Sequence, residues 1–282
     1  MPGILYVVAT PIGNLEDVTL RAVRVLREVS LIAAEDTRRT ARLLQHYSIS
    51  TPTTSLHEHN ERARTPALIE KLRQGRSIAL VSDAGTPVIS DPGTLLVAAA
   101  HEAGIRVEPI PGPSAAVAAL SASGFSSDQV LFVGFPPARA NARKQWLSEL
   151  RAERRLIVLF EAPHRIESTL KGIAEYFGNR PILLARELTK LHEELVVRPI
   201  DEVLATLKEP RGEYTVVIAP PPTSPATTNS HPTAAELRKE FGEMTNMPGG
   251  GRRDAIRRLA EKYHVSPKAM YQLLEEAKNS VD

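Results

Sequence analysis

Four short loops of the chain have the residue types that suit close binding of a polar ligand. Each follows an apolar run, and they read TPIGN (10–14), EDTR (35–38), DAGTP (83–87) and PGPS (111–114). Loops rich in glycine and small polar residues present backbone N–H and C=O groups with few bulky side chains in the way. One such loop would only mark a turn, but four predict a ligand site. The chain has no G-x-G-x-x-G and no Walker sequence, so we do not expect a dinucleotide or a P-loop nucleotide.

Charged residues in and beside these loops are candidates for acid–base chemistry. Asp83 directly follows an apolar run, where a buried carboxylate needs a partner, so it would be either a helix cap or a ligand contact. Asp36 would either act in the site or cap the helix that follows it. Lys190 lies beyond a predicted strand and would stabilise a developing negative charge or bind phosphate. Arg186 and Glu187 would act there too, or form an ion pair between domains.

The first 125 residues contain the elements that must position these loops. Strands are predicted at 4–9, 31–34, 77–82 and 106–110, and a helix with a threonine N-cap is predicted at 19–29. Strands that are apolar on both faces and separated by helices indicate a parallel sheet covered on both sides. Ligands bind beyond the carboxyl ends of such strands, so we expect the four loops to meet at one cleft.

Residues 126–219 predict a second α/β domain. Its strands are expected at 130–134, 156–160, 182–186, 194–197 and 214–219, and its helices at 140–153, 165–177 and 201–207. The strands 182–186 and 194–197 have only a short connection and should pair antiparallel. The sequence therefore predicts an α/β protein with two α/β domains, at 1–125 and 126–219.

A linker and a helical tail follow. Residues 220–232 (PPPTSPATTNSHP) have nothing to bury and predict an extended Pro/Ser/Thr linker. Residues 233–282 predict three short helices, at 234–243, 252–263 and 267–278. Ser266 should cap the last of them, with Pro267 at its first position.

The tail carries a surplus of positive charge. Residues 252–268 contain six basic residues and two acidic ones, behind the glycines 249–251. Charges alone would indicate only a solvated helix face. Together with the linker and the turn, a basic helix followed by a second helix resembles a nucleic-acid-binding helix-turn-helix. We therefore expect this tail to bind nucleic acid, and Arg139, Arg143, Lys144 and Trp146 would extend the surface.

Composition excludes several classes of protein. The 282 residues include no cysteine, which rules out disulfides, thiolate zinc sites, iron–sulfur clusters and a cysteine nucleophile. Hydrophobic residues make up 42% and charged residues 24%, and Lys+Arg (35) nearly balances Asp+Glu (33). These proportions are those of an ordinary globular protein. No apolar run approaches the ~18 residues of a membrane span. We expect a cytoplasmic protein without membrane contact.

Several segments stand in the order of one known family. They are LYVVATPIGNL (5–15), AEDTR (34–38), HEHN (57–60), SDAGTPVISDPG (82–93), IPGPSA (110–115), EAPHR (161–165), RELTK (186–190) and Gly212-Glu213. Together they resemble the ribosomal RNA small subunit methyltransferase I family, of the tetrapyrrole-methylase-like class. The resemblance covers residues 4–219 and extends into the tail.

The resemblance implies an activity and a cofactor. The expected reaction is 2′-O-methylation of the ribose of cytidine 1402 in 16S ribosomal RNA, with S-adenosylmethionine (SAM) as methyl donor and no metal. The expected partners are the small-subunit rRNA or the subunit itself and a second copy of the chain, but no DNA. Matching positions place SAM between the domains, against Pro11, Asp83, Gly85, Thr86, Ser114 and Ala115, and against Ala162 of the second domain.

A ribose hydroxyl is a poor acid, so a positioned base or a nearby cation would help its methylation. The candidates are Asp36 as proton acceptor, Lys190 as the group that favours the alkoxide or holds a phosphate, and Arg186. The residues do not single out one base. His57 and His59 would share a face of a strand, but two histidines without further ligands do not predict a metal site. They are expected to contact RNA or the second copy.

Two other functions fit parts of the sequence. A methyltransferase of the same fold acting on a tetrapyrrole would have no need of the basic tail. A ligand-sensing transcriptional regulator would read DNA through its last helix, residues 267–278. That helix has few side chains able to read bases and includes Glu275 and Glu276, which disfavours the regulator.

Overall fold

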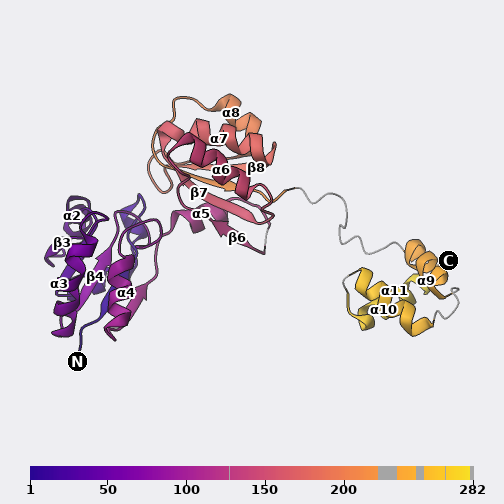
Figure 1. The fold of residues 1–282 in the computed structure, drawn as a ribbon, viewed down its shortest axis with the longest axis horizontal. Helices are drawn as coiled ribbons and strands as arrows, with labels where there is room; N and C mark the ends of the chain where they lie inside the picture. The colour runs from indigo at the N-terminus through magenta and orange to yellow at the C-terminus, as the bar shows by residue number, and fades with distance from the viewer. Residues whose placement is uncertain (127, 222–233, 246–250, 264, 280–282) are drawn as a thin grey trace. The chain divides into compact units, whose positions relative to one another are not determined.

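A computed structural model describes residues 1–126, 128–221, 234–245, 251–263 and 265–279 (Figure 1). The chain forms two compact units, Met1–Pro221 and Pro222–Asp282. The predicted linker at 220–232 lies outside the described residues from position 222 onward, and Gly249 and Gly250 of the predicted glycine run also lie outside them.

The first half of the larger unit is built on a parallel sheet, as predicted, and this sheet has five strands where the sequence indicated four. Its order is β3-β2-β4-β1-β5. The strands are β1 (Leu5–Val8), β2 (Leu31–Ala34), β3 (Thr53–Ser55), β4 (Ile78–Val81) and β5 (Val107–Ile110). Sequence reasoning missed β3, because its three residues are polar and show no apolar run; pairing with β2 defines it.

Helices cover both faces of this sheet. On one face α1 (Leu20–Glu28) and α2 (Thr37–His46) share an apolar core with β1 and β4. On the other face α3 (Glu61–Arg73) and α4 (Thr94–Glu102) pack through leucines and alanines. The side chain of Thr19 accepts from Ala22 N, which confirms the predicted N-cap of α1. A short 3-10 helix, η1 (Leu15–Asp17), precedes it.

The second half contains a mixed sheet in the order β6-β7-β10-β8-β9. Its strands are β6 (Val130–Phe132), β7 (Leu156–Glu161), β8 (Pro181–Arg186), β9 (Glu194–Pro199) and β10 (Tyr214–Ile218). Among these described strands, only β6 and β7 pair in parallel. Strands β8 and β9 pair antiparallel, as their short connection predicted.

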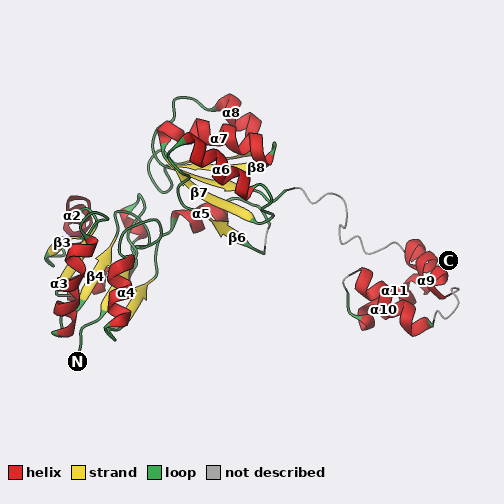
Figure 2. Ribbon diagram, in the orientation of Figure 1, coloured by secondary structure: helices red, strands yellow, loops and turns green. Residues whose placement is uncertain are grey.

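Helix α5 (Ala115–Ala122) joins the two halves. It follows β5 of the first sheet, but Ala116 and Ala119 pack against β7, β8 and β10 of the second. The opposite face of that sheet is covered by α6 (Ala140–Leu150), α7 (Pro163–Phe177) and α8 (Ile200–Thr206) (Figure 2). Helix α7 begins two residues before the predicted 165, because Pro163 occupies the first turn, where its missing N–H costs nothing.

The smaller unit contains three helices in its described residues, α9 (Ala234–Thr245), α10 (Arg252–Lys262) and α11 (Pro267–Asn279). They enclose an apolar core that includes Leu237, Leu259, Met270 and Leu274. Ser266 Oγ accepts from Ala269 N at 3.2 Å, so the predicted cap of the last helix is confirmed. In the described parts of the chain, no helix is long and apolar enough to cross a membrane.

Candidate active site

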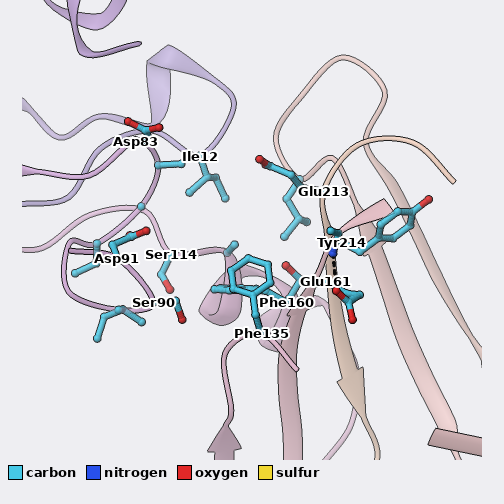
Figure 3. Close-up of a pocket in the computed structure, with 18 of the residues that line it drawn as sticks. Ile12, Asp83, Ser90, Asp91, Ser114, Phe135, Phe160, Glu161, Glu213 and Tyr214 are labelled. Atoms are coloured by element: carbon cyan, nitrogen blue, oxygen red, sulfur yellow. Dashed lines mark hydrogen bonds between the residues drawn. The ribbon is translucent and has the colours of Figure 1, made fainter. Parts of the chain in front are cut away.

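The larger unit contains a cavity of about 560 Å³ where the loops of its two halves meet (Figure 3). From the first half, residues after β2, β4 and β5 line it; from the second, residues around β7, β10 and the loop after β8. Asp83, Asp91 and Ser114 line the cavity on one side, and Glu161, Glu213 and Tyr214 line it on the other, with the Tyr214 ring pointing away from it. The expectation that the strand-end loops converge is therefore met inside one unit.

The loop after β4 is held by the loop after β1. Thr10 and Gly85 exchange two backbone hydrogen bonds, of 2.8 and 2.9 Å, and Thr10 Oγ1 donates to Ser82 O. Gly85 has φ +81°, and a Cβ there would lie 3.4 Å from Ile12. L side chains rarely adopt this backbone conformation. Thr86 Oγ1 donates to Pro113 O of the loop after β5. Three strand-end loops thus form one rigid wall.

The same loop continues through strained backbone. Val88 has φ +74° and Ser90 has φ +67°. Left-handed backbone is costly for a β-branched residue and persists only where its surroundings impose it. Ile89, Ser90 and Asp91 of this segment line the cavity, so the strain lies at the site.

Three carboxyl groups lie close together on this wall. Asp83 pairs with Arg39 at 3.3 Å and accepts from Asp36 N at 3.0 Å, while Glu35 accepts from Asp83 N at 3.2 Å. Burial raises the pKa of Glu35. The negative charges of the neighbouring Asp83 and Asp36 raise this pKa further, whereas the positive charge of Arg39 lowers it. Burial, with the charges of Glu35 and Asp83, raises the pKa of Asp91 to about 6. The wall is an acidic surface.

The opposite wall depends on a buried ion pair. The side chain of Glu161 is 0% exposed and binds Arg165 at 2.6 Å, Thr169 Oγ1 at 2.6 Å and Ala162 N at 2.8 Å. Arg165 also donates to Pro136 O. These bonds fix the start of α7 and the loop after β6. Phe135 lies on Phe160, with ring centroids 5.5 Å apart, and both line the cavity.

Lys190 enters the cavity from the loop after β8. Its Nζ binds Glu187 Oε1 at 2.8 Å and Glu213 Oε2 at 3.1 Å. Burial alone would lower the pKa of Lys190, but these two hydrogen-bonded carboxylates raise it above its usual value. Its neighbour Thr189 accepts from Asn14 N at 3.0 Å, so this loop also contacts the loop after β1. Lys190 is therefore a cation held in place at neutral pH.

Comparison with known proteins identifies the family. Residues 4–204 match the family of Tetrapyrrole (Corrin/Porphyrin) Methylases. The chain is 48% identical over 276 residues to ribosomal RNA small subunit methyltransferase I of Synechocystis sp., covering 96% of this chain and 97% of that protein. The relative of that name from Haemophilus influenzae is 43% identical over 277 residues, 96% of each chain. The chain belongs to the ribosomal RNA small subunit methyltransferase I family.

Two solved structures with low sequence identity have the same fold. A crystal structure of diphthine synthase has a TM-score of 0.60 at 14% identity and covers 77% of this chain and 90% of its own. A crystal structure of uroporphyrin-III-C-methyltransferase from Thermus thermophilus has a TM-score of 0.53 at 22% identity, and the match covers 76% of this chain and 94% of that chain. At these identities the likeness concerns the fold alone.

The cavity is lined by most of the residues that we expected to contact SAM. They are Asp83, Gly85, Thr86, Ser114 and Ala115 of the first half and Ala162 of the second. Pro11 is not among the lining residues, whereas its neighbour Ile12 is. The structure thus brings together residues from separate segments of the chain.

The three residues considered for catalysis differ in position. Lys190 lines the cavity, but Asp36 and Arg186 do not. Asp36 caps α2 by accepting from Arg38 N at 2.8 Å, and its carboxylate also pairs with the Arg38 guanidinium. Hydrogen bonds from Arg38 lower the pKa of Asp36 to about 2, which makes it a weak proton acceptor. Arg186 donates to Arg211 O and pairs with Glu194 instead of Glu187.

Sequence reasoning did not single out several residues that line the cavity. Asp91 and Glu161 stand in the quoted motifs 82–93 and 161–165, but nothing local marks either as part of a site. Phe135 and Phe160 are brought together by the pairing of β6 with β7. Among the described residues, no group of three or more His, Asp or Glu could hold a metal ion. His57 and His59 stack edge to face, and Asn60 bonds to the His57 ring.

Proposed function

We propose that this protein is a SAM-dependent methyltransferase that methylates the ribose 2′-hydroxyl of cytidine 1402 in 16S rRNA. Relatives named ribosomal RNA small subunit methyltransferase I, at 43% and 48% identity over 96% of the chain, are the observation that carries the proposal. The choice of cytidine 1402 and of its 2′-oxygen rests on the family resemblance of the motifs quoted above.

The residues around the cavity fit SAM. The cavity has a volume of about 560 Å³. Small-molecule and cofactor sites have volumes of this order. The carboxylates of Glu35 and Asp83 suit the ammonium and sulfonium charges, and the paired rings of Phe135 and Phe160 suit an aromatic base. At Gly85 there is no side chain, which lets a ligand approach the backbone. When bound, the cofactor supplies an activated methyl group on a sulfonium.

The chain's own residues would then position the groups. Asp83, Gly85, Thr86, Ser114 and Ala115 would hold the cofactor from the first half, and Ala162 would hold it from the second. Lys190, kept charged by its two carboxylate partners, would contact a phosphate or favour a partly deprotonated hydroxyl. Arg186 is the last residue of β8, directly before this loop, and would act only by supporting it.

Exposed arginines next to the cavity support an RNA substrate. Arg38, Arg39 and Arg42 lie in the first turns of α2, and Arg62 and Arg64 in those of α3. Both helices begin at the carboxyl-end edge of the first sheet, and Arg39 itself lines the cavity. Within the described part of the chain, Arg42 and Arg62 have no acidic partner. Such side chains would bind phosphates of the RNA backbone.

We propose that the small helical unit also binds RNA. Its ion pairs are Arg252–Glu275, Arg257 and Arg258 with Asp254, and Lys262–Glu240. All four basic partners remain exposed, and exposed pairs exchange readily with other charges. Residues 252–268 contain six basic residues and two acidic ones, a local excess of four positive charges in the sequence.

A homodimer is part of the proposal. Strand β9 is an edge of the second sheet, and its Leu195 and Val197 are exposed. Leu191, in the loop before it, is 93% exposed. Apolar side chains grouped at an edge strand are a surface that a second copy would cover. Light scattering at micromolar concentration would give twice the chain mass.

The decisive experiment is transfer from labelled SAM to small ribosomal subunits that lack the modification, followed by mapping of the labelled nucleotide and atom. Label on the 2′-oxygen of cytidine 1402 is expected. Parallel reactions with naked 16S rRNA and with a tetrapyrrole define the substrate. Label on a base nitrogen, or on the tetrapyrrole alone, would contradict the proposal.

A further inference from the structure

Five carboxylate side chains of the described residues line the cavity, and they differ in how far the protein already uses them. They are Glu35, Asp83, Asp91, Glu161 and Glu213. A group that accepts a proton during the reaction must reach the cavity and must not be held by a cation, because a neighbouring cation keeps a carboxylate ionised and weakly basic. The contacts of these five side chains therefore distinguish which of them could accept a proton.

Four of the five are engaged in fixed contacts. Glu161 is buried under Arg165 and Thr169, and Glu213 is bound to Lys190. Asp83 is paired with Arg39 and accepts from Asp36 N. Glu35 accepts from Asp83 N and is thereby directed to the backbone of that loop. Each of these carboxylates has a structural role.

Asp91 has no such role. It lies two residues before Gly93, the N-cap residue of α4, and Glu61 of α3 instead binds the first turn of that helix, accepting from Leu95 N at 2.8 Å and Leu96 N at 3.2 Å. Among the described residues, no cation pairs with Asp91; its hydrogen-bond partner is Ser82. The strained backbone at Val88 and Ser90 holds the segment against the cavity.

The surroundings of Asp91 favour proton uptake near neutral pH. The charged groups facing it are Glu35 after β2 and Asp83 after β4, with Arg39 of α2 beyond them on Asp83. Burial comes first in raising the pKa of Asp91, and the two carboxylates add to it; the hydrogen bond from Ser82 opposes them. The resulting pKa of about 6 leaves Asp91 ionised at pH 7 but able to take a proton.

We propose that Asp91 is the group that removes the proton from the acceptor hydroxyl. This inference rests on the proposed methylation of a ribose oxygen. As the hydroxyl oxygen forms its bond to the transferred methyl carbon, its proton moves to a carboxylate oxygen of Asp91. The methyl–sulfur bond breaks, and its electron pair stays on sulfur, so the sulfonium charge is lost as Asp91 becomes neutral. Atoms and charge balance without a metal or another reactant.

The test compares Asp91→Asn with Asp91→Glu and with Asp201→Asn, an exposed aspartate of α8 as matched control. Single-turnover methylation at saturating SAM and subunits is measured from pH 5 to 9, and SAM affinity is measured by calorimetry. Asp91→Asn should lose about 10²–10⁴-fold in rate while SAM affinity changes only a few-fold. Asp91→Glu should recover part of the rate, and Asp201→Asn should match the wild type.

The wild-type pH profile keeps the proposal testable even if a variant fails to fold. Its single-turnover rate should rise about tenfold per pH unit below the pKa of Asp91, about 6, and level off above it. A flat profile, or an Asp91→Asn variant with the wild-type rate, would overturn the assignment. Loss of SAM binding in Asp91→Asn would overturn it too, since Asp91 would then hold the cofactor. Label on an atom other than oxygen in the wild type would contradict the proposed function itself.

Discussion

At the scale of single residues, the geometry separates side chains that shape the cavity from those that stabilise its walls. Gly85 and Asp91 lie within one loop that lines the cavity. Gly85 has no side chain and leaves its backbone accessible, whereas Asp91 contributes a carboxylate. Asp36 stands one residue from the cavity-lining Glu35, but its carboxylate serves the start of α2. Position in the chain therefore says little about what a side chain contacts.

Gly85→Val should abolish SAM binding. The new side chain would stand at φ +81° with its Cβ 3.4 Å from Ile12. We expect the cofactor to meet the backbone at this point, so a branched side chain would block it. Calorimetry measures the affinity. Gly104→Val is the matched control, because Gly104 also has a positive φ of 65° but no atom lies within 4 Å of its Cβ position. Equal SAM affinity in both folded variants would remove Gly85 from the site.

The Lys190→Ala variant should show whether Lys190 assists the chemical step or binds RNA. If Lys190 assists the reacting oxygen, the single-turnover rate at saturation falls about 10²–10⁴-fold. If it binds phosphate, the loss appears in the RNA concentration required and deepens at higher salt. Lys171→Ala, an exposed lysine of α7 that pairs with Glu167, is the control. An unchanged rate and an unchanged salt dependence would leave Lys190 outside the reaction.

At the scale of elements, the start of α7 is part of the second wall of the cavity, and two ion pairs made by α7 differ in burial: Arg165 pairs with Glu161 at the end of β7, and Lys171 pairs with Glu167 within the helix. Glu161–Arg165 and Glu167–Lys171 have the same 2.6 Å separation and the same i,i+4 spacing. The side chain of Glu161 is 0% exposed, whereas that of Glu167 is 58% exposed. Solvent screening alone should make their energetic roles different.

Glu161→Gln should lower the free energy of unfolding by about 3–5 kcal/mol, because Arg165 would lose its carboxylate in a poorly solvated site. Glu167→Gln should cost at most about 1 kcal/mol. Urea denaturation followed by circular dichroism gives both values. Similar losses for the two variants would mean that the buried pair does not anchor the start of α7.

At the scale of the whole molecule, the chain consists of two units, each with its own internal contacts. The residues that line the cavity all lie between Ile12 and Thr215, inside the larger unit. The helices α9, α10 and α11 have their own apolar core. The proposed binding of SAM in the cavity and the proposed binding of RNA by the small unit can therefore be tested separately.

Deletion of residues 233–282 should leave the larger unit folded and able to bind SAM, because the removed helices contribute nothing to the cavity. Methylation of subunits should fall, chiefly through a higher subunit concentration for half-maximal rate. Calorimetry and initial rates measure the two effects. A truncated protein that methylates subunits at the full rate with unchanged affinity would show that the tail does not bind substrate.

Much of the fold follows from local sequence. Apolar runs such as 31–34 and 78–81 predict buried strands, because strands covered on both faces need apolar side chains at every position. Caps at Thr19 and Ser266 mark helix starts through a side-chain oxygen that accepts a backbone N–H, which is a local interaction. The parallel first sheet and the antiparallel β8–β9 pair follow from the lengths of the connections between strands, which are also local.

The tertiary structure decided which charges meet. Sequence alone directs attention to Asp36 and Asp83, whereas nothing local marks Asp91 as part of a site. Arg38 pairs with Asp36 two residues away, but only folding places Arg39 on Asp83 and Glu61 at the start of α4, leaving Asp91 near two carboxylates without a cation among the described residues. Most of the secondary structure depends on neighbours in the chain, so the sequence determined it, apart from β3, which is defined by its pairing with β2. Charge states depend on neighbours in space, which the packing of two sheets and their loops supplies.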